Sequence, residues 1–526
     1  MEYSFNAGIN KKRIAGKMTK LKQIIEKLSK LNIILAADIK TETIEELDGD
    51  SLIQTILELE NIKLEEENRQ ELKTENPKHI ILDNSKLIKI IDRIKSEKIP
   101  VPIEINRNEQ FRPSAKDIES DFKIYNQERN TEPVRGIENF TKYFNSRLQK
   151  MKKILNKRMG YHFLDNLKII KKFMNGHEVE IVGIISKKLT TKNGNIFVEL
   201  EDETDQVKVI FMNSNSKESR DMFNNASKLV NDEIIGIKGK ISNQFIIANK
   251  FIWPDIKIKV RKKIEDDFSI AFISDIHAGS KLFMEKNFVS MLKWINGDIN
   301  KDIEIAKKLK YIVIGGDVAD GIGVYPNQEK DLLIPDIYQQ YSLLFNMLNE
   351  IPDHIHIFIM PGNHDATQRA EPQPPFDESI IKDFKKNNFH FIKNPSFLTL
   401  NGIDVLTYHG TSLDSIISAI PNMSYMKPEA AMIELLKRRH LCPIYGENII
   451  IPSIADELVI DKTPDILHMG HIHRNGIDNY KGVKIINSGT WQAKTEFQTR
   501  QGHIPTPCQL SIYDSKIDYF KILDFS

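Results

Sequence analysis

The sequence predicts a multidomain α+β protein with a small N-terminal helical domain, a central β-barrel and a C-terminal layered α/β domain. Three observations predict this order. Apolar residues first recur at helical spacing, then fall into short alternating runs, and finally form runs that each end in a polar cluster. In addition, a chain of 526 residues exceeds what one hydrophobic core usually organises, so several domains are expected.

Charge and cysteine count exclude several classes of protein. The chain has 74 Lys and Arg against 73 Asp and Glu, so a polyanion would be bound only through local contacts. Its two cysteines, Cys442 and Cys508, cannot form a disulfide framework or a zinc knuckle. We also find no apolar signal segment and no run approaching the roughly 18 apolar residues of a membrane span. We therefore expect a cytoplasmic protein without a membrane partner.

The N-terminal domain is predicted to cover residues 1–98. Apolar residues recur there at helical spacing from Lys17 to about Lys98, and the acidic run Glu65–Glu67 is interpreted as a solvated face. Residues 99–135 are rich in Asn, Glu, Arg and Pro and show no sustained period. This composition predicts a linker.

Residues 136–262 are predicted to form a helix followed by a barrel. Gly136–Arg158 is amphipathic, and His177–Pro254 contains short alternating runs separated by turn signals. The order of these runs resembles an OB-fold. Such barrels often bind single-stranded nucleic acid through aromatic and basic residues, here Phe197, Phe211 and Lys208. A barrel that only packs on neighbouring domains is an equally supported alternative.

Residues 263–526 are predicted to form the layered α/β domain. Five apolar runs give way to polar clusters, at the point where the side chains of a layered sheet can converge on one site. The clusters contain the following residues in order: Asp275 and His277, Asp317 and Asp320, Asn363 and His364, His409, and His471 and His473.

These clusters predict a centre with two divalent metal ions. They offer oxygen and imidazole ligands without thiolate, which suits Mn²⁺, Mg²⁺, Fe²⁺ or Zn²⁺. Two ions roughly 3.5–4 Å apart need a bridging carboxylate, and Asp317 is the natural candidate. One such cluster is weak evidence, but five in order are strong evidence. His354, His356 and His468 fit no cluster and are interpreted as structural residues.

The order of the motifs resembles the calcineurin-like metallophosphoesterase superfamily. The resemblance implies one ion held by Asp275, His277 and His473. It implies a second ion held by Asn363, His409 and His471, with Asp317 shared between the two. It also implies a catalytic His364, oriented by Asp320, that hydrogen-bonds the phosphate or protonates the leaving oxygen.

Longer blocks around these motifs resemble the small subunit of the archaeal family-D DNA polymerase. They are Asp317–Leu332, Pro361–Pro375, Tyr408–Ile417, Leu435–Glu447 and Asn487–Gln498. The resemblance implies a proofreading 3′-to-5′ exonuclease, stimulated by Mn²⁺, that acts on single-stranded or primer-template DNA. It also implies a large polymerising subunit as partner, in a heterodimer or heterotetramer. Ala319, Asn327 and Cys442 depart from the pattern, where Val, Gly and Ala are expected, but none of them removes a ligand.

Two further points have alternatives. Arg438, Arg439 and His440 are candidate contacts to DNA phosphates, or they cap a helix end and pack on Tyr445. The rival functions are a catalytically silent scaffold, as in related second subunits of eukaryotic polymerases, and a phosphodiesterase with another substrate. The complete ligand set favours an active enzyme that is also a scaffold for the large polymerase subunit, and the added domains disfavour the second rival.

Overall fold

The computed structural model describes residues 33–35, 80–82, 111–125, 137–158, 160–214, 216–382, 384 and 386–526. The chain divides into two compact units, Met1–Ile103 and Glu104–Ser526. In the first unit, strands β1 (Ile33–Leu35) and β2 (Ile80–Leu82) pair in parallel. The helical domain predicted for residues 1–98 otherwise lies outside the described residues, and this strand pair is not part of that prediction.

The predicted barrel is confirmed as a closed five-stranded barrel. Its strands, in the order in which they pair, are β4 (Glu178–Thr190), β5 (Ile196–Glu201), β6 (Gln206–Phe211), β8 (Phe245–Ile252) and β7 (Ile234–Ser242). Gly239 lies where the register between β7 and β8 shifts, and a Cβ there would come within 2.5 Å of the Ile247 carbonyl oxygen. Glycine therefore allows the close strand approach at this corner.

Two six-stranded sheets form the rest of the second unit. The first, in pairing order, contains β12 (Phe389–Phe391), β11 (His356–Met360), β10 (Leu309–Gly315), β9 (Ser269–Ile273), β18 (Gln509–Asp514) and β19 (Tyr519–Asp524). The second contains β16 (Gly476–Tyr480), β17 (Val483–Asn487), β15 (Ile466–Met469), β14 (Ile403–Thr407), β13 (Ser396–Leu400) and β3 (Phe122–Tyr125).

The sheets pack face to face over an apolar core. Phe272, Val313 and Phe358 of the first sheet share one buried cluster with Val405 and Ile486 of the second, and all five are fully buried. Each large apolar side chain buried in this way contributes about 1.5–3 kcal/mol. Because β9, β10 and β14 are buried along their whole length, they are seen in the sequence as continuous apolar runs.

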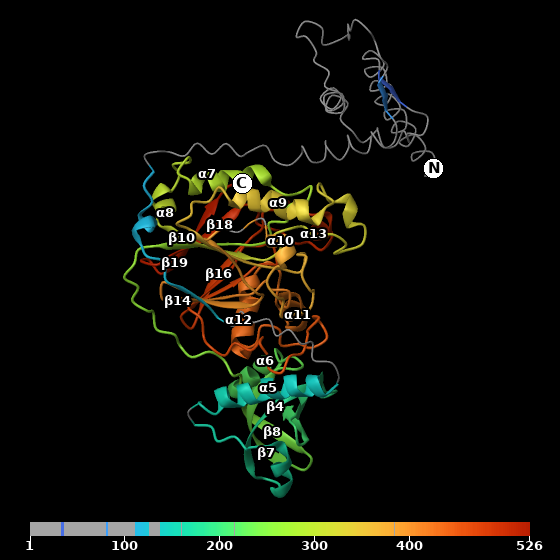
Figure 1. Ribbon diagram of the computed structural model, residues 1–526. Coiled ribbons are helices and arrows are strands. Elements are labelled where there is room, and N and C mark those ends of the chain that lie inside the picture. The colour runs from blue at the N-terminus through green and yellow to red at the C-terminus, as the bar shows by residue number, and fades with distance from the viewer. Residues whose placement is uncertain are drawn as a thin grey trace, which may run out of the picture. The chain divides into compact units, whose positions relative to one another are not determined.

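Helices cover the outer faces of both sheets (Figure 1). On one side lie α7 (Glu285–Ile295), α8 (Ile303–Lys307), α9 (Ile337–Leu348) and α10 (Glu378–Ile381). On the other side lie α11 (Leu413–Ala419) and α12 (Pro428–Arg438), which pack on the second sheet. In the described part of the chain, no helix combines the length and apolar character needed to cross a membrane.

Helix α5 (Ile137–Leu155) lies between the barrel and the second sheet. Its Leu148 and Met151 pack with Val182 of the barrel and Val459 of the layered domain. Arg147 forms a buried ion pair with Asp456, at a distance of 2.6 Å between Nε and Oδ2. The amphipathic helix predicted for Gly136–Arg158 is thus present, and it joins the two domains.

Part of the predicted linker belongs to the second sheet. Within residues 99–135, η1 (Ser114–Asp117) is a short helix and β3 pairs antiparallel with β13. The Lys310 ammonium donates a 3.1 Å hydrogen bond to the Ala115 carbonyl, which holds this segment against β10. A strand of four residues is too short for a periodicity test, so the sequence interpretation missed it.

The basic stretch Lys257–Lys263 joins the barrel to the layered domain. It has no regular structure, and Lys259 and Lys262 pair with acids of the layered domain. Lys259 Nζ lies 2.8 Å from Asp465, and Lys262 Nζ lies 2.9 Å from Asp404. These contacts hold the stretch against the layered domain.

Candidate metal centre

The predicted ligands lie on loops after the carboxyl ends of parallel strands in both sheets. They follow β9, β10, β11, β14 and β15, and are, in chain order, Asp275 and His277, Asp317, Asn363, His409, and His471 and His473. Five of them have left-handed backbone, with φ of 52° at Asp275, 52° at His277, 50° at Asp317, 70° at His471 and 57° at His473. Such conformations cost of order 1–3 kcal/mol each and cluster at functional sites.

The first group of side chains is Asp275, His277 and His473. The Nε2 atoms of the two histidines lie 3.1 Å apart, and His473 Nε2 lies 3.4 Å from Asp275 Oδ1. The ligand atoms of the three residues are all within 4.8 Å of one another. All three side chains are buried.

The second group is Asp317, His409 and His471, again with ligand atoms within 4.8 Å of one another. His409 Nε2 lies 3.3 Å from Asp317 Oδ2 and 2.9 Å from Asn363 Oδ1. Asp317 Oδ2 also lies 3.9 Å from Nε2 of His277 in the first group. Asp317 is thus situated between the groups, as a bridging carboxylate must be.

The remaining ring nitrogens are held by other residues. His409 Nδ1 donates to the Gly315 carbonyl at 2.8 Å, and the Gln498 amide contacts His473 Nδ1 at 2.9 Å. Asp414 Oδ2 lies 2.9 Å from His471 Nε2. Contacts of this kind fix the tautomer and orientation of histidine ligands.

Asp320 contacts His364 through its backbone carbonyl and not through its carboxylate. The Asp320 carboxylate accepts from His277 Nδ1 at 3.0 Å, whereas His364 Nδ1 donates to the Asp320 backbone carbonyl at 2.8 Å. Gln492 and Gln328 also donate to the carboxylate, at 3.1 Å each. Asp320 therefore orients both histidines, but its charge acts on His277.

The electrostatics of the site show an excess of buried negative charge. Burial alone would lower the pKa of His277, but the hydrogen bond to Asp320 and the charges of Asp320, Asp317 and Asp275 raise it to about 9. Burial also opposes the charged form of His409, yet the charge and hydrogen bond of Asp317 raise its pKa to about 10. In this geometry, protons on the histidines compensate the carboxylates.

The donor set fits divalent cations. The histidine nitrogens lie 2.9–3.9 Å from each other, from the Asn363 amide oxygen and from the carboxylates, and a cation between them would replace the compensating protons. All donors are carboxylate, amide or imidazole groups, which suits hard or borderline ions. Cys442 and Cys508 are buried free thiols outside both groups.

Two of the histidines interpreted as structural, His356 and His468, have structural contacts. His468 is fully buried between Thr407 and Ser488, with ring nitrogens 3.0 and 2.9 Å from their hydroxyl oxygens, and burial lowers its pKa to about 3. His356 stacks on His390 with ring centroids 5.2 Å apart. Burial also lowers the pKa of His354, to about 4.

The tentative DNA contacts at Arg438, Arg439 and His440 are wrong, because all three side chains are buried. Arg438 pairs with Glu233 and Glu434, at 2.7 and 2.6 Å. Arg439, which ends α12, donates to Thr463 and Asp461, and His440 contacts Asp456. Arg439 therefore lies at a helix end, as the alternative prediction for these residues expects. Tyr445, however, packs on Phe140 and Phe144 instead.

Phe211, one of the suggested nucleic-acid contacts on the barrel, is also unavailable. Its side chain is fully buried in the barrel core. The other aromatic candidate, Phe197, is partly exposed and lies edge-on to Phe245, with ring centroids 6.4 Å apart. A surface role on the barrel therefore remains open to Phe197 but not to Phe211.

Several residues at the site were missed in the sequence. Asp365 accepts backbone hydrogen bonds from Val318, Ala319 and Gly362, at 3.2, 3.1 and 2.8 Å, and so fixes two ligand loops together. Asp414 follows His409 by five residues and lies in the first turn of α11. An acidic residue so close to a candidate ligand was a signal in the sequence that could have identified it. Gln492 and Gln498 offered no such signal.

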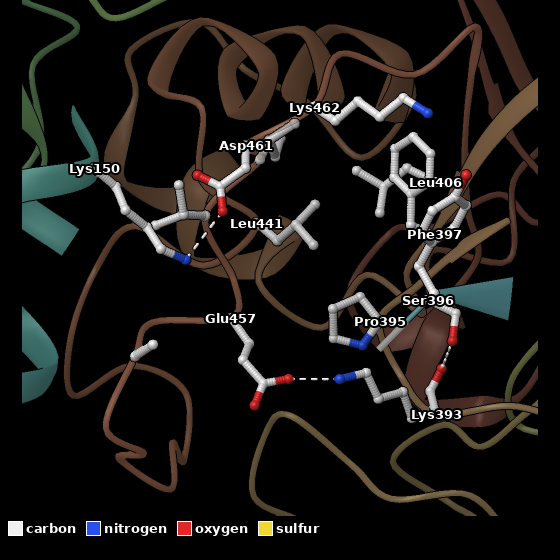
Figure 2. A pocket seen from close by; sticks show the side chains of 14 residues that line it. Lys150, Lys393, Pro395, Ser396, Phe397, Leu406, Leu441, Glu457, Asp461 and Lys462 are labelled. Atoms are coloured by element: carbon white, nitrogen blue, oxygen red, sulfur yellow. Dashed lines mark hydrogen bonds and ion pairs between the residues drawn. The ribbon is translucent and has the colours of Figure 1, made fainter. Parts of the chain in front are cut away.

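Two large cavities lie on the second unit. The one in Figure 2 has a volume of about 770 Å³, and four of its charged side chains form two pairs, Lys393 with Glu457 and Lys150 with Asp461. The other has a volume of about 780 Å³ and is lined by the predicted ligands Asn363 and His471 and by barrel residues 229–231. This second cavity connects the site to the barrel.

Comparison with known proteins matches the chain to two family models and to curated relatives. Residues 270–476 match the model that describes the B subunit of DNA polymerases alpha and epsilon, and residues 179–262 match that of an OB-fold nucleic acid binding domain. The relative from Pyrococcus horikoshii, a DNA polymerase II small subunit, is 40% identical over 81% of this chain and 70% of its own length. Proteins of the same description from Archaeoglobus fulgidus and Methanothermobacter thermautotrophicus are 42% and 39% identical, over 72% and 77% of this chain and 75% and 83% of their own.

Proposed function

Because this chain belongs to the family of archaeal DNA polymerase II small subunits, we propose that it is a metal-dependent nuclease that removes nucleotides from the 3′ end of DNA. The proposed role is proofreading beside a large polymerising subunit, in a heterodimer or heterotetramer. The proposed substrate is single-stranded or frayed primer-template DNA. The match of the barrel to a nucleic-acid-binding OB-fold supports a substrate of this kind.

The observation that carries the proposal is the two adjacent ligand groups with His364 beside them. Burying carboxylates is costly unless they are paired with a counter-charge. A subunit that served only as a scaffold would have no use for five ligands in left-handed backbone around such a centre. A catalytic role would explain both the cost of burying the carboxylates and the cost of the left-handed backbone.

The chain's own residues have distinct roles in this proposal. The residues that would hold two divalent ions are Asp275, His277 and His473 for one, and Asn363, His409 and His471 for the other, with Asp317 shared. When bound, such ions, Mn²⁺ foremost, supply positive charge to the phosphodiester oxygens and acidify the attacking water. Gly315 and Asp320 hold the Nδ1 protons of His409 and His277, which leaves both Nε2 atoms as donors to the ions.

His364 is the proposed catalytic residue. Its backbone N–H donates to Asp317 Oδ1 at 2.8 Å, and its Nδ1 donates to the Asp320 carbonyl. These two bonds fix the imidazole and leave Nε2 for the substrate. In its doubly protonated form, the ring there donates a hydrogen bond from Nε2 to a phosphate oxygen or gives the Nε2 proton to the leaving oxygen, as a general acid does.

Digestion of a 5′-labelled single-stranded oligonucleotide tests the function directly. With Mn²⁺, we expect a ladder that shortens from the 3′ end, and with EDTA no cleavage. His364→Gln should lower kcat by about 10²–10⁴-fold, because the general acid is lost while a side chain of similar shape remains. Exposed His162, replaced by Gln, is the matched control and should behave as wild type. No cleavage by the wild type, even with the large subunit added, would leave only the scaffold function.

Asp414→Asn is expected to weaken metal binding without removing a ligand. Asp414 contacts Nε2 of His471, so the nitrogen left for a cation is Nδ1. Replacing such an outer partner typically costs 10–100-fold in metal affinity. Mn²⁺ binding measured by electron paramagnetic resonance should show this loss. Asp461→Asn is a suitable control, since Asp461 is similarly exposed and pairs with Lys150. Equal affinities of Asp414→Asn and wild type would contradict the role given to Asp414.

A further inference from the structure

A loop with exposed apolar residues lies directly beside His364. In Gly321–Asn327, Tyr325 is 40% exposed and Ile322 50%. The ring centroids of Tyr325 and His364 are 6.4 Å apart, with ring planes inclined by 60°. Gly321, with φ of 79°, packs so closely that a Cβ there would come within 2.2 Å of the His364 carbonyl oxygen. An exposed aromatic ring is thus held next to the proposed catalytic residue.

The loop is fixed by hydrogen bonds on both sides of this ring. The Tyr325 hydroxyl donates to Asp331 Oδ2 at 3.0 Å, and the Val324 N–H donates to Gln328 Oε1 at 2.9 Å. Gln328 Nε2 in turn donates to the Asp320 carbonyl at 2.8 Å. The position of the ring is therefore tied to the residue that orients His364. A side chain already ordered in this way loses little entropy when a ligand binds to it.

The same loop borders the cavity that reaches the predicted ligands. Val324 and Arg369 line it together with Asn363 and His471. Arg369 is exposed, and its Nη2 donates to the Gly323 carbonyl at 2.9 Å, so it joins the loop to the ligand segment around Asn363. A DNA strand with a phosphate at the metal centre would therefore have its neighbouring nucleotides within reach of the loop.

We propose that Tyr325 stacks on the nucleobase of the 3′-terminal nucleotide and so positions the phosphodiester bond next to His364. The proposal rests on the proposed nuclease function and names what the site recognises besides phosphate. Every base has a π face, so such a contact accepts all four bases, as an exonuclease requires. A substrate whose terminal residue has no base would lack this stacking contact.

The test compares two 5′-labelled single strands, one with a normal 3′-terminal nucleotide and one with a tetrahydrofuran abasic residue there. Loss of one stacking contact corresponds to roughly tenfold. Tyr325→Ala should therefore lower kcat/KM about tenfold on the normal strand and leave the abasic strand unchanged. Tyr325→Phe keeps the ring and should stay within about twofold of wild type on both strands.

Tyr519→Ala is the matched control. Tyr519 is 62% exposed and pairs with Asp514, which itself pairs with Ser269 at the start of β9, whereas the metal centre follows the end of that strand. Equal losses for Tyr325→Ala on both strands would mean that the ring acts on His364 instead of a base, and no loss on either would mean that it contacts no base. Both results would overturn the proposal.

A second measurement separates this proposal from the nuclease function. A strand ending in 2-aminopurine, mixed with excess protein in EDTA, should lose fluorescence on binding wild type, because stacking quenches this base. Tyr325→Ala should show little of this loss. If the wild type cleaves no DNA, the nuclease function fails, and the fluorescence alone then decides whether Tyr325 stacks on the terminal base.

Discussion

Replacing Asp317 by Asn is expected to abolish nuclease activity while the protein stays folded. Asp317 is 1% exposed and lies between the two ligand groups. Asn keeps its size and can still accept the His364 N–H, but it removes the negative charge that two cations would share. Metal ions contribute several kcal/mol to such reactions, and about 4 kcal/mol corresponds to roughly a thousandfold loss of kcat. The oligonucleotide assay measures the loss, and the melting temperature measures the fold.

Asp302→Asn is the matched control for this variant. Asp302 pairs with Lys521 and has left-handed backbone, φ 51°, which Asn tolerates. It should keep full activity. Elemental analysis gives an independent readout, since Asp317→Asn should retain less bound Mn²⁺ than wild type. Normal activity of Asp317→Asn would refute the shared-ligand role and with it the two-ion reaction.

Replacing Arg438 by Met is expected to cause the largest loss of stability. The guanidinium is buried between Glu233 of the barrel and Glu434 of α12, and its Nη2 donates to the Lys228 carbonyl at 2.6 Å. Met preserves much of the volume but leaves buried Glu233 without a cation and Glu434 with Lys437 alone, and breaking a buried pair of this kind costs about 3–5 kcal/mol. Urea unfolding followed by tryptophan fluorescence should show this, because Trp253 donates to Glu233 at 3.0 Å.

Combining Arg438→Met with Glu233→Gln should recover part of this stability, because one of the two carboxylates is then neutral. Arg261→Met is the control: that arginine is 52% exposed, so its ion pair with Asp518 is expected to contribute at most about 1 kcal/mol. An Arg438→Met protein with unchanged stability but weaker, less salt-dependent DNA binding would restore the phosphate-contact interpretation.

The convergence of the candidate ligands was predictable because their signal is local. Each ligand directly follows a buried strand, and parallel strands bring their carboxyl ends to one edge. The barrel was predictable for a similar reason, since its alternation and turn glycines are properties of short segments. Sequence spacing therefore identified both the strands and the side chains at their ends.

The errors concern partners that only the tertiary structure determines. In the sequence, Arg438 and Arg439 resemble a basic patch, because charge alone does not show that Glu233, distant in the chain, lies beside Arg438. The sequence also does not show that the Asp320 carboxylate contacts His277, whereas its backbone carbonyl contacts His364. Gln498 contacts His473 only because α13 (Glu496–Arg500) begins with a capping box that turns its side chain inward.

The pairing of β3 with β13 makes the barrel an insertion within the layered domain. The first strand of the second sheet precedes the barrel, and its partner is synthesised only long after the barrel is complete. During translation, the barrel therefore has all its strands while β3 still has an unpaired edge, and closing this long-range contact is a slow step. Once it closes, the barrel is anchored to the layered domain at both of its ends. Two attachment points restrict rotation of the barrel relative to the layered domain more than a single connection would.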